Sequence, residues 1–108
     1  MVGITPLTYQ ILLALADGDG HGYGIIKEIE QRSGSASAPS TGALYLALQR
    51  MEREGLIEEA PPRPEGDARR RYYRLSAKGR QCAEQESMHL VLLVAAARDK
   101  KLIEGGAS

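Results

Sequence analysis

Arginine side chains gather in one short stretch of this sequence. Arg69, Arg70 and Arg71 are consecutive, and Arg63 precedes them by a few residues. A guanidinium group stays charged in proteins and can donate two parallel hydrogen bonds to one phosphate. The stretch therefore indicates contact with nucleic-acid phosphates, along the backbone or in a narrow minor groove. The alternative is a soluble loop whose arginines face only water.

The distribution of charge keeps that interpretation open although the chain is neutral overall. Lys and Arg number 14, and so do Asp and Glu. Residues 63–80 hold seven basic and two acidic residues, a net charge of +5, and the remainder of the chain carries −5. Salt screens charges beyond about 8–10 Å at physiological ionic strength. A concentrated basic segment can therefore hold phosphates locally.

A second group of candidates lies at the start of a predicted helix. Small residues there would let the backbone approach DNA closely, namely Ser40, Thr41 and Gly42. Longer side chains follow on the predicted exposed side, namely Tyr45, Gln49 and Arg50. Gln can pair with adenine and Arg with guanine, each pair contributing about 1–3 kcal/mol of discrimination. The alternative is a capped helix with a solvated face, which for Gln49 is equally well supported.

The remaining candidate residues have a structural interpretation beside any functional one. Tyr23 and Lys27 could contact phosphates, or Tyr23 could pack under the hairpin while Lys27 faces water. His21 and His89 lack metal-ligand spacing, so both are interpreted as structural and no metal is expected. The single Cys82 is interpreted as structural too, with a redox sensor as the alternative. No nucleophile with its base and no phosphate loop is present, so we expect neither an enzyme nor a cofactor.

Three helices are predicted before the arginine stretch. Each combines apolar residues at helical spacing with local start and stop signals, over residues 6–16, 23–32 and from Ser40 or Thr41 to 53. Thr5-Pro6 is a typical helix start, and Gly55 is a natural left-handed helix end. In the third helix, Leu44, Leu48 and Met51 are expected in the core, with Tyr45 and Leu46 beside them.

Two strands are predicted around the arginine stretch, over residues 56–60 and 71–75. The loop between them, residues 61–68, is rich in Pro and should form a long hairpin tip. Because side chains alternate along a strand, Tyr73 and Leu75 are predicted to face the core. Tyr72 and Arg74 would then face outward.

A long final helix is predicted from Ser76 to Leu102. Its apolar residues cover nearly all sides, and a helix of that kind needs burial on more than one face. A chain of 108 residues has little left to cover it, which indicates a partner subunit. The apolar run Met88–Ala97 is shorter than the roughly 20 residues that cross a bilayer. With no basic-then-apolar leader and a single cysteine, we expect a cytoplasmic protein.

The order of elements predicts a mainly α winged helix-turn-helix with a two-stranded β-wing and a long C-terminal dimerisation helix. The domains would be residues 1–76 for DNA binding, 77–104 for dimerisation and 105–108 as a flexible tail. Three stretches also resemble the PadR family of bacterial transcription regulators, in its short form with one C-terminal helix. They are His21-Gly22-Tyr23-Gly24-Ile25, the segment from Ser40-Thr41-Gly42-Ala43-Leu44-Tyr45 to Glu54-Gly55-Leu56-Ile57, and Arg71-Tyr72-Tyr73-Arg74-Leu75-Ser76.

The resemblance implies a homodimer, with each third helix in a major groove of double-stranded DNA and each wing near a minor groove. The C-terminal helices and the first helix would form the interface, with candidate residues Leu7, Ile11, Leu90, Leu93, Val94 and Ala97. It also implies a repressor on a palindromic operator, controlled by a small-molecule effector or a partner. The chain has no Trp, so a flat-drug pocket is not supported. The alternative is a winged-helix protein-interaction module without DNA binding, which Leu46-Ala47 and the neutral charge favour slightly.

Overall fold

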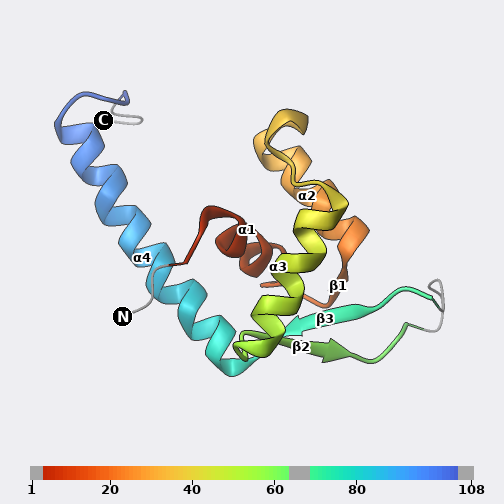
Figure 1. Ribbon diagram of the computed structural model, residues 1–108. Coiled ribbons are helices and arrows are strands. Elements are labelled where there is room, and N and C mark those ends of the chain that lie inside the picture. Colours follow the sequence, from red (N-terminus) through yellow and green to blue (C-terminus); the bar gives the residue numbers. More distant parts are fainter. Residues whose placement is uncertain (1–3, 64–68, 105–108) are drawn as a thin grey trace.

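The computed structural model describes residues 4–63 and 69–104, which form four α-helices and three strands (Figure 1). In chain order these are α1 (Pro6–Ala14), β1 (Gly20–His21), α2 (Gly22–Ser33), α3 (Thr41–Arg53), β2 (Ile57–Ala60), β3 (Tyr72–Leu75) and α4 (Ala77–Asp99). A short 3-10 turn, Ser35–Ser37, lies in the predicted loop between α2 and α3. The mainly α winged-helix layout is confirmed, although α1 and α4 end earlier than predicted. The tip of the predicted hairpin loop and the predicted tail lie outside the described residues.

The helix starts are set by local hydrogen bonds, as the sequence predicts. Thr5, Ser40 and Ser76 each accept a hydrogen bond from the backbone N–H three residues on, at 3.0–3.1 Å. Each hydroxyl thereby satisfies one of the N–H groups that a helix start leaves without a partner. Gly55 ends the α3 region with φ of 79°, the left-handed conformation that glycine adopts without steric cost.

The sheet has a third strand that the sequence did not predict. Its order is β1-β3-β2, and both pairings are antiparallel. The hairpin pairs Ile57 with Leu75 and Ala60 with Tyr72, while β1 pairs His21 with Tyr72 on the other edge of β3. A two-residue strand carries no alternating pattern of its own. It forms because β3 offers an unpaired edge next to the turn that precedes α2.

The third strand explains why one prediction about β3 is wrong. Tyr73 is buried as expected, but Tyr72 is buried too, with 6% of its surface exposed. The Tyr72 ring lies edge-on to the ring of His21, 5.3 Å between centroids, and Arg63 lies over it. Both faces of β3 are therefore covered, so the alternation of side chains does not make one tyrosine an exposed residue.

The core lies where α1, α2 and α3 meet the sheet. Its fully buried large side chains are Ile11, Leu12, Ile29, Leu44, Leu48, Met51 and Ile57. Ile11 has 0% exposure, so its side chain has no surface left for another subunit. The prediction that Ile11 forms part of a dimer interface is therefore wrong: its helix face is filled by the chain's own core.

Helix α4 follows the hairpin and packs against α1, where the hydroxyl groups of Tyr9 and Ser87 lie 2.7 Å apart, and its C-terminal part extends beyond the other helices (Figure 1). Its start is fixed to the segment after α3, because the Gly79 position lies directly against the backbone carbonyl of Leu56. A Cβ at residue 79 would lie 1.9 Å from that oxygen. The backbone N–H of Ser76 donates to the same carbonyl at 3.1 Å. Among the described residues, no helix has the length and apolar character needed to span a membrane.

Candidate nucleic-acid interface

One face of α3 is exposed and carries most of the predicted base-contacting residues. Ser40, Thr41, Gly42, Tyr45 and Gln49 are all exposed. The opposite face is buried through Leu44, Ala47, Leu48 and Met51. Leu46 lies on the exposed face with 68% of its surface accessible, whereas the sequence predicted it beside the core. Ala47 takes the buried position instead, because helical geometry turns it to the same side as Leu44 and Leu48.

Arg50 is not on that exposed face as predicted. Its guanidinium donates a hydrogen bond to Oγ1 of Thr8 in α1, at 2.9 Å. Thr8 is buried, and its hydroxyl oxygen also accepts a hydrogen bond from Thr5 Oγ1 at 2.9 Å. Arg50 therefore links the centre of α3 to α1. The expectation of a free guanine-contacting side chain is wrong for this conformation.

The wing arginines lie over tyrosine rings. Arg63 is 5.6 Å from the ring centroid of Tyr72, Arg70 is 5.7 Å from that of Tyr23, and Arg71 is 5.8 Å from that of Tyr73. Lys27 lies over the same Tyr23 ring at 5.4 Å, and its ammonium is 3.7 Å from Glu30. Cation–π contacts of this kind contribute about 0.5–1 kcal/mol each at exposed sites. The aromatic rings therefore hold the charged groups at the base of the wing.

Arg71 has a second partner within the hairpin. Its guanidinium forms an ion pair with Glu59 of β2 at 2.9 Å, and both side chains are more than half exposed. This hydrogen bond with Arg71 lowers the pKa of Glu59 below its usual value. In order to contact a phosphate, Arg71 would therefore have to break its ion pair with Glu59 or bind the carboxylate and the phosphate together. Arg63 and Arg70 carry no such acidic side-chain partner in the hydrogen bonds of the described residues.

The wing and the two helices enclose a crevice of about 230 Å³. It is lined by His21, Gly22, Tyr23, Tyr45, Arg69, Arg70 and Arg71. Gly22 makes the close approach of α2 and α3 possible, since a Cβ there would lie 2.5 Å from the Tyr45 hydroxyl. The crevice brings together the predicted contacts of α2, α3 and the wing, which lie far apart in the sequence.

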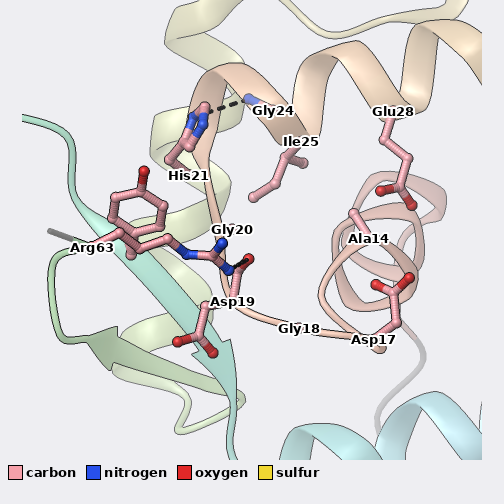
Figure 2. Close-up of a pocket in the computed structure, with 11 residues that line it drawn as sticks. Ala14, Asp17, Gly18, Asp19, Gly20, His21, Gly24, Ile25, Glu28 and Arg63 are labelled. Carbon is pink, nitrogen blue, oxygen red and sulfur yellow. Dashed lines mark hydrogen bonds between the residues drawn. The ribbon is translucent and has the colours of Figure 1, made fainter. Parts of the chain in front are cut away.

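His21, which the sequence analysis interpreted as structural, also belongs to this site. It is the N-cap of α2, and its Nδ1 accepts a hydrogen bond from the Gly24 N–H at 3.1 Å (Figure 2). Its Nε2 lies 3.1 Å from a guanidinium nitrogen of Arg70. Its position directly before Gly22-Tyr23-Gly24, at a helix start, is the available sequence signal. Burial lowers the pKa of His21, and the nearby charges of Arg70 and then Arg63 lower it further.

His21 also lines a second, polar cavity of about 360 Å³ (Figure 2). Asp17, Asp19 and Glu28 line it together with Arg63, which donates a hydrogen bond to the backbone carbonyl of Asp19 at 3.2 Å. Within residues 4–63 and 69–104, no group of three His, Cys, Asp or Glu side chains is placed to hold a metal ion. The cavity connects the turn before β1 to the base of the wing.

Helix α4 presents an apolar surface that the chain itself does not cover. Met88, Val91, Leu92, Leu93 and Val94 are all exposed. Of the remaining candidate interface residues, Leu7, Leu90 and Ala97 are half-buried. Exposed apolar side chains on several sides of one helix usually indicate that the helix packs against a partner.

Comparisons with known proteins agree with this fold. The model of the transcriptional regulator PadR-like family matches residues 11–85. A relative, an uncharacterized 37.1 kDa protein in a transposon of Streptomyces fradiae, is 42% identical over 83 residues, or 77% of this chain. The chain spans only 22% of the length of that relative.

Two solved structures show the same fold. A PadR family transcription regulator from Clostridium difficile is 27% identical, with a TM-score of 0.76 covering 88% of this chain and 97% of that one. PadR of Bacillus subtilis, whose structure is a complex with operator DNA, is 23% identical, with a TM-score of 0.65 covering 75% of this chain and 46% of that one. The family model covers well over half of the sequence and includes α2, α3 and the wing. The chain therefore belongs to the PadR-like family of transcriptional regulators.

Proposed function

We propose that this protein is a homodimeric transcriptional repressor that binds a palindromic operator and occludes a promoter. The observation that carries the proposal is the crevice beside the exposed face of α3, which is lined by Tyr23, Tyr45, Arg69, Arg70 and Arg71. The crevice brings side chains that can bind phosphate to the same surface as the exposed face of α3. A neutral chain needs such local concentration of charge in order to bind DNA.

In this proposal α3 enters the major groove with its N-terminal residues toward the base edges. Ser40, Thr41 and Gly42 allow the close approach, while Tyr45 and Gln49 supply longer contacts. Arg63, Arg69, Arg70 and Arg71 reach phosphates or the minor groove, and Tyr23 and Lys27 contact the backbone beside them.

The second subunit would pack on the apolar surface of α4. Leu93 and Val94 lie on that surface, and Leu7, Leu90 and Ala97 would become buried at its edges. Two copies related by a two-fold axis would place their α3 helices one DNA turn apart, or a multiple of it. A small-molecule effector that changed this separation would switch such a dimer.

The test is capture of genomic DNA fragments by the purified protein, followed by sequencing. Two triple variants are compared with the wild type. In the first, Arg69, Arg70 and Arg71 become Ala; in the second, Arg98, Lys100 and Lys101 around the end of α4 become Ala and remove the same charge. We expect a palindromic site with the wild type and the α4 variant, and no such site with the wing variant. For the wing variant, the slope of log affinity against log salt concentration should also become shallower, by about 0.9 for each phosphate that the protein no longer neutralises.

Leu46 favours a second candidate function, a protein-interaction module. A large apolar side chain with 68% exposure on the central helix fits a protein partner as well as a DNA groove. The same experiment separates the two functions. If no fragment is enriched even at low salt, where electrostatic binding is strongest, the DNA-binding proposal is refuted and Leu46 becomes the place to search for a protein partner.

A further inference from the structure

His21 is held where β1, α2 and the base of the wing meet. It belongs to β1, caps α2, and lies beside Arg70 at the base of the wing. Its ring contacts Tyr72 edge-on at 5.3 Å, and the Gly24 position lies so close that a Cβ there would be 3.3 Å from the ring. The imidazole is therefore fixed in orientation by its surroundings.

The two nitrogen atoms of a neutral His21 cannot both accept the hydrogen bonds that the Gly24 N–H and the Arg70 guanidinium offer. A neutral imidazole has one N–H donor and one acceptor. If Nδ1 accepts from the Gly24 N–H, then Nε2 carries the proton and faces Arg70, whose guanidinium only donates. If Nε2 instead accepts from Arg70, the helix cap is lost. An anion within reach of both donors removes the conflict, because Nε2–H and the guanidinium can then donate to it together.

The charges around His21 favour its neutral form until such an anion arrives. Burial and the charges of Arg70 and Arg63 lower its pKa. Protonation would also break the cap, since an imidazolium has no acceptor nitrogen. The other titratable groups that face the two adjoining cavities are Asp17, Asp19, Tyr23, Glu28, Tyr45, Arg69, Arg71 and Tyr72. Glu28 pairs with Arg32 and Arg71 with Glu59, so both are partly neutralised.

We propose that a DNA backbone phosphate binds between His21, Arg70 and Tyr23, and that the protein takes up a proton at His21 when it binds. The inference rests on the proposed function and assigns His21 a place in it as a phosphate-contacting, proton-linked residue. The phosphate offsets the positive field of the two arginines and accepts the hydrogen bonds of the imidazolium. It also offsets the loss of the helix cap at Gly24.

The direction of the pH dependence follows from the change in protonation. The pKa of His21 is lowered in the free protein and raised by the phosphate. The additional affinity is therefore fully present below the free-state pKa and is lost as pH rises through the pKa of the complex. At most one proton is taken up per subunit, so affinity changes by at most about tenfold per pH unit per subunit.

The experiment measures binding of the full chain to a fluorescent duplex that contains the enriched site, between about pH 5.5 and 8.5. Ionic strength is held constant and phosphate buffers are avoided because phosphate would compete. The key variant is His21→Asn, because Asn is a good helix cap that does not titrate. The control is His89→Asn, which removes the exposed histidine beside Glu86 on α4. Thermal unfolding of each variant checks that it folds.

We expect roughly three- to tenfold tighter binding per subunit as pH falls from about 8 to about 6 for the wild type and for His89→Asn. The profile of His21→Asn should be flat over that range. Calorimetry in two buffers with different heats of ionisation should detect proton uptake by the wild type that His21→Asn lacks. If the two profiles coincide, or if the wild type takes up no proton, this inference is refuted while DNA binding stands. If no duplex binds at any pH, the proposed function fails and the inference fails with it.

Discussion

Replacing Gly79 by Ala tests whether the close packing at the start of α4 is real. The added Cβ would lie 1.9 Å from the carbonyl oxygen of Leu56 and 2.9 Å from its carbon. Because both atoms belong to the backbone, no side-chain rotation can relieve the overlap, and the two segments must separate by roughly 1 Å. Such overpacking costs about 1–3 kcal/mol. Losing the Ser76 hydrogen bond to the same carbonyl adds about 1 kcal/mol.

The predicted loss for Gly79→Ala is therefore about 2–4 kcal/mol, or roughly 10–25 °C in Tm for a domain of this size. Gly42→Ala is the matched control, because it also adds a methyl group in a first helical turn but has no atom within 4 Å. Alanine at residue 42 should raise stability by up to about 1 kcal/mol. Circular dichroism at one protein concentration measures both variants. A Tm for Gly79→Ala within about 2 °C of the wild type would show that the described packing is wrong.

Three further changes test the links between elements. Gly22→Ala should displace the Tyr45 ring, which is a flexible neighbour, so stability should fall by less than about 1 kcal/mol while DNA affinity falls clearly in a fluorescence titration. Thr8→Val and Arg50→Met should each cost about 1–2 kcal/mol in denaturant unfolding, and the double variant should cost less than their sum because they remove one shared hydrogen bond. Leu93→Glu places a charge on the exposed apolar surface of α4, so sedimentation should show a shift from dimer to monomer.

Local signals explain the part of the fold that the sequence predicts well. The three hydroxyl caps and the glycine at residue 55 depend on neighbours only a few positions away. The sequence therefore contains all the information that such features need. The same holds for the buried stripe of α3, where a 3.6-residue period distinguishes Leu48 from Gln49 without any knowledge of the other helices.

Contacts between distant segments explain what the sequence missed. Strand β1 forms because β3 has a free edge, and Tyr72 is buried because β1 brings His21 against it and Arg63 lies over its ring. Arg50 lies near the exposed side of its helix by periodicity. Its long side chain nevertheless reaches Thr8, 42 positions earlier in the chain. The helical period gives the face on which a Cβ atom lies. It does not give the position of the guanidinium group at the end of a flexible arginine side chain.

For the candidate site too, the sequence predicts which residues take part but not how they are arranged. The run of arginines is plain in the sequence, and it predicts phosphate contact whatever the fold. The structure adds that three of these side chains lie over aromatic rings, in the pairs Arg63–Tyr72, Arg70–Tyr23 and Arg71–Tyr73.

An arginine held over a ring has already given up part of its rotamer freedom before any ligand arrives. Ordering a mobile side chain at an interface costs about 0.5–1.5 kcal/mol, so each preorganised arginine loses less of its phosphate-binding energy to ordering. This matters most for a chain with zero net charge, which has no long-range attraction to DNA and depends on contacts at short distance. The contacts of Arg63, Arg70 and Arg71 with tyrosine rings therefore let a neutral protein concentrate phosphate-binding groups without carrying excess charge.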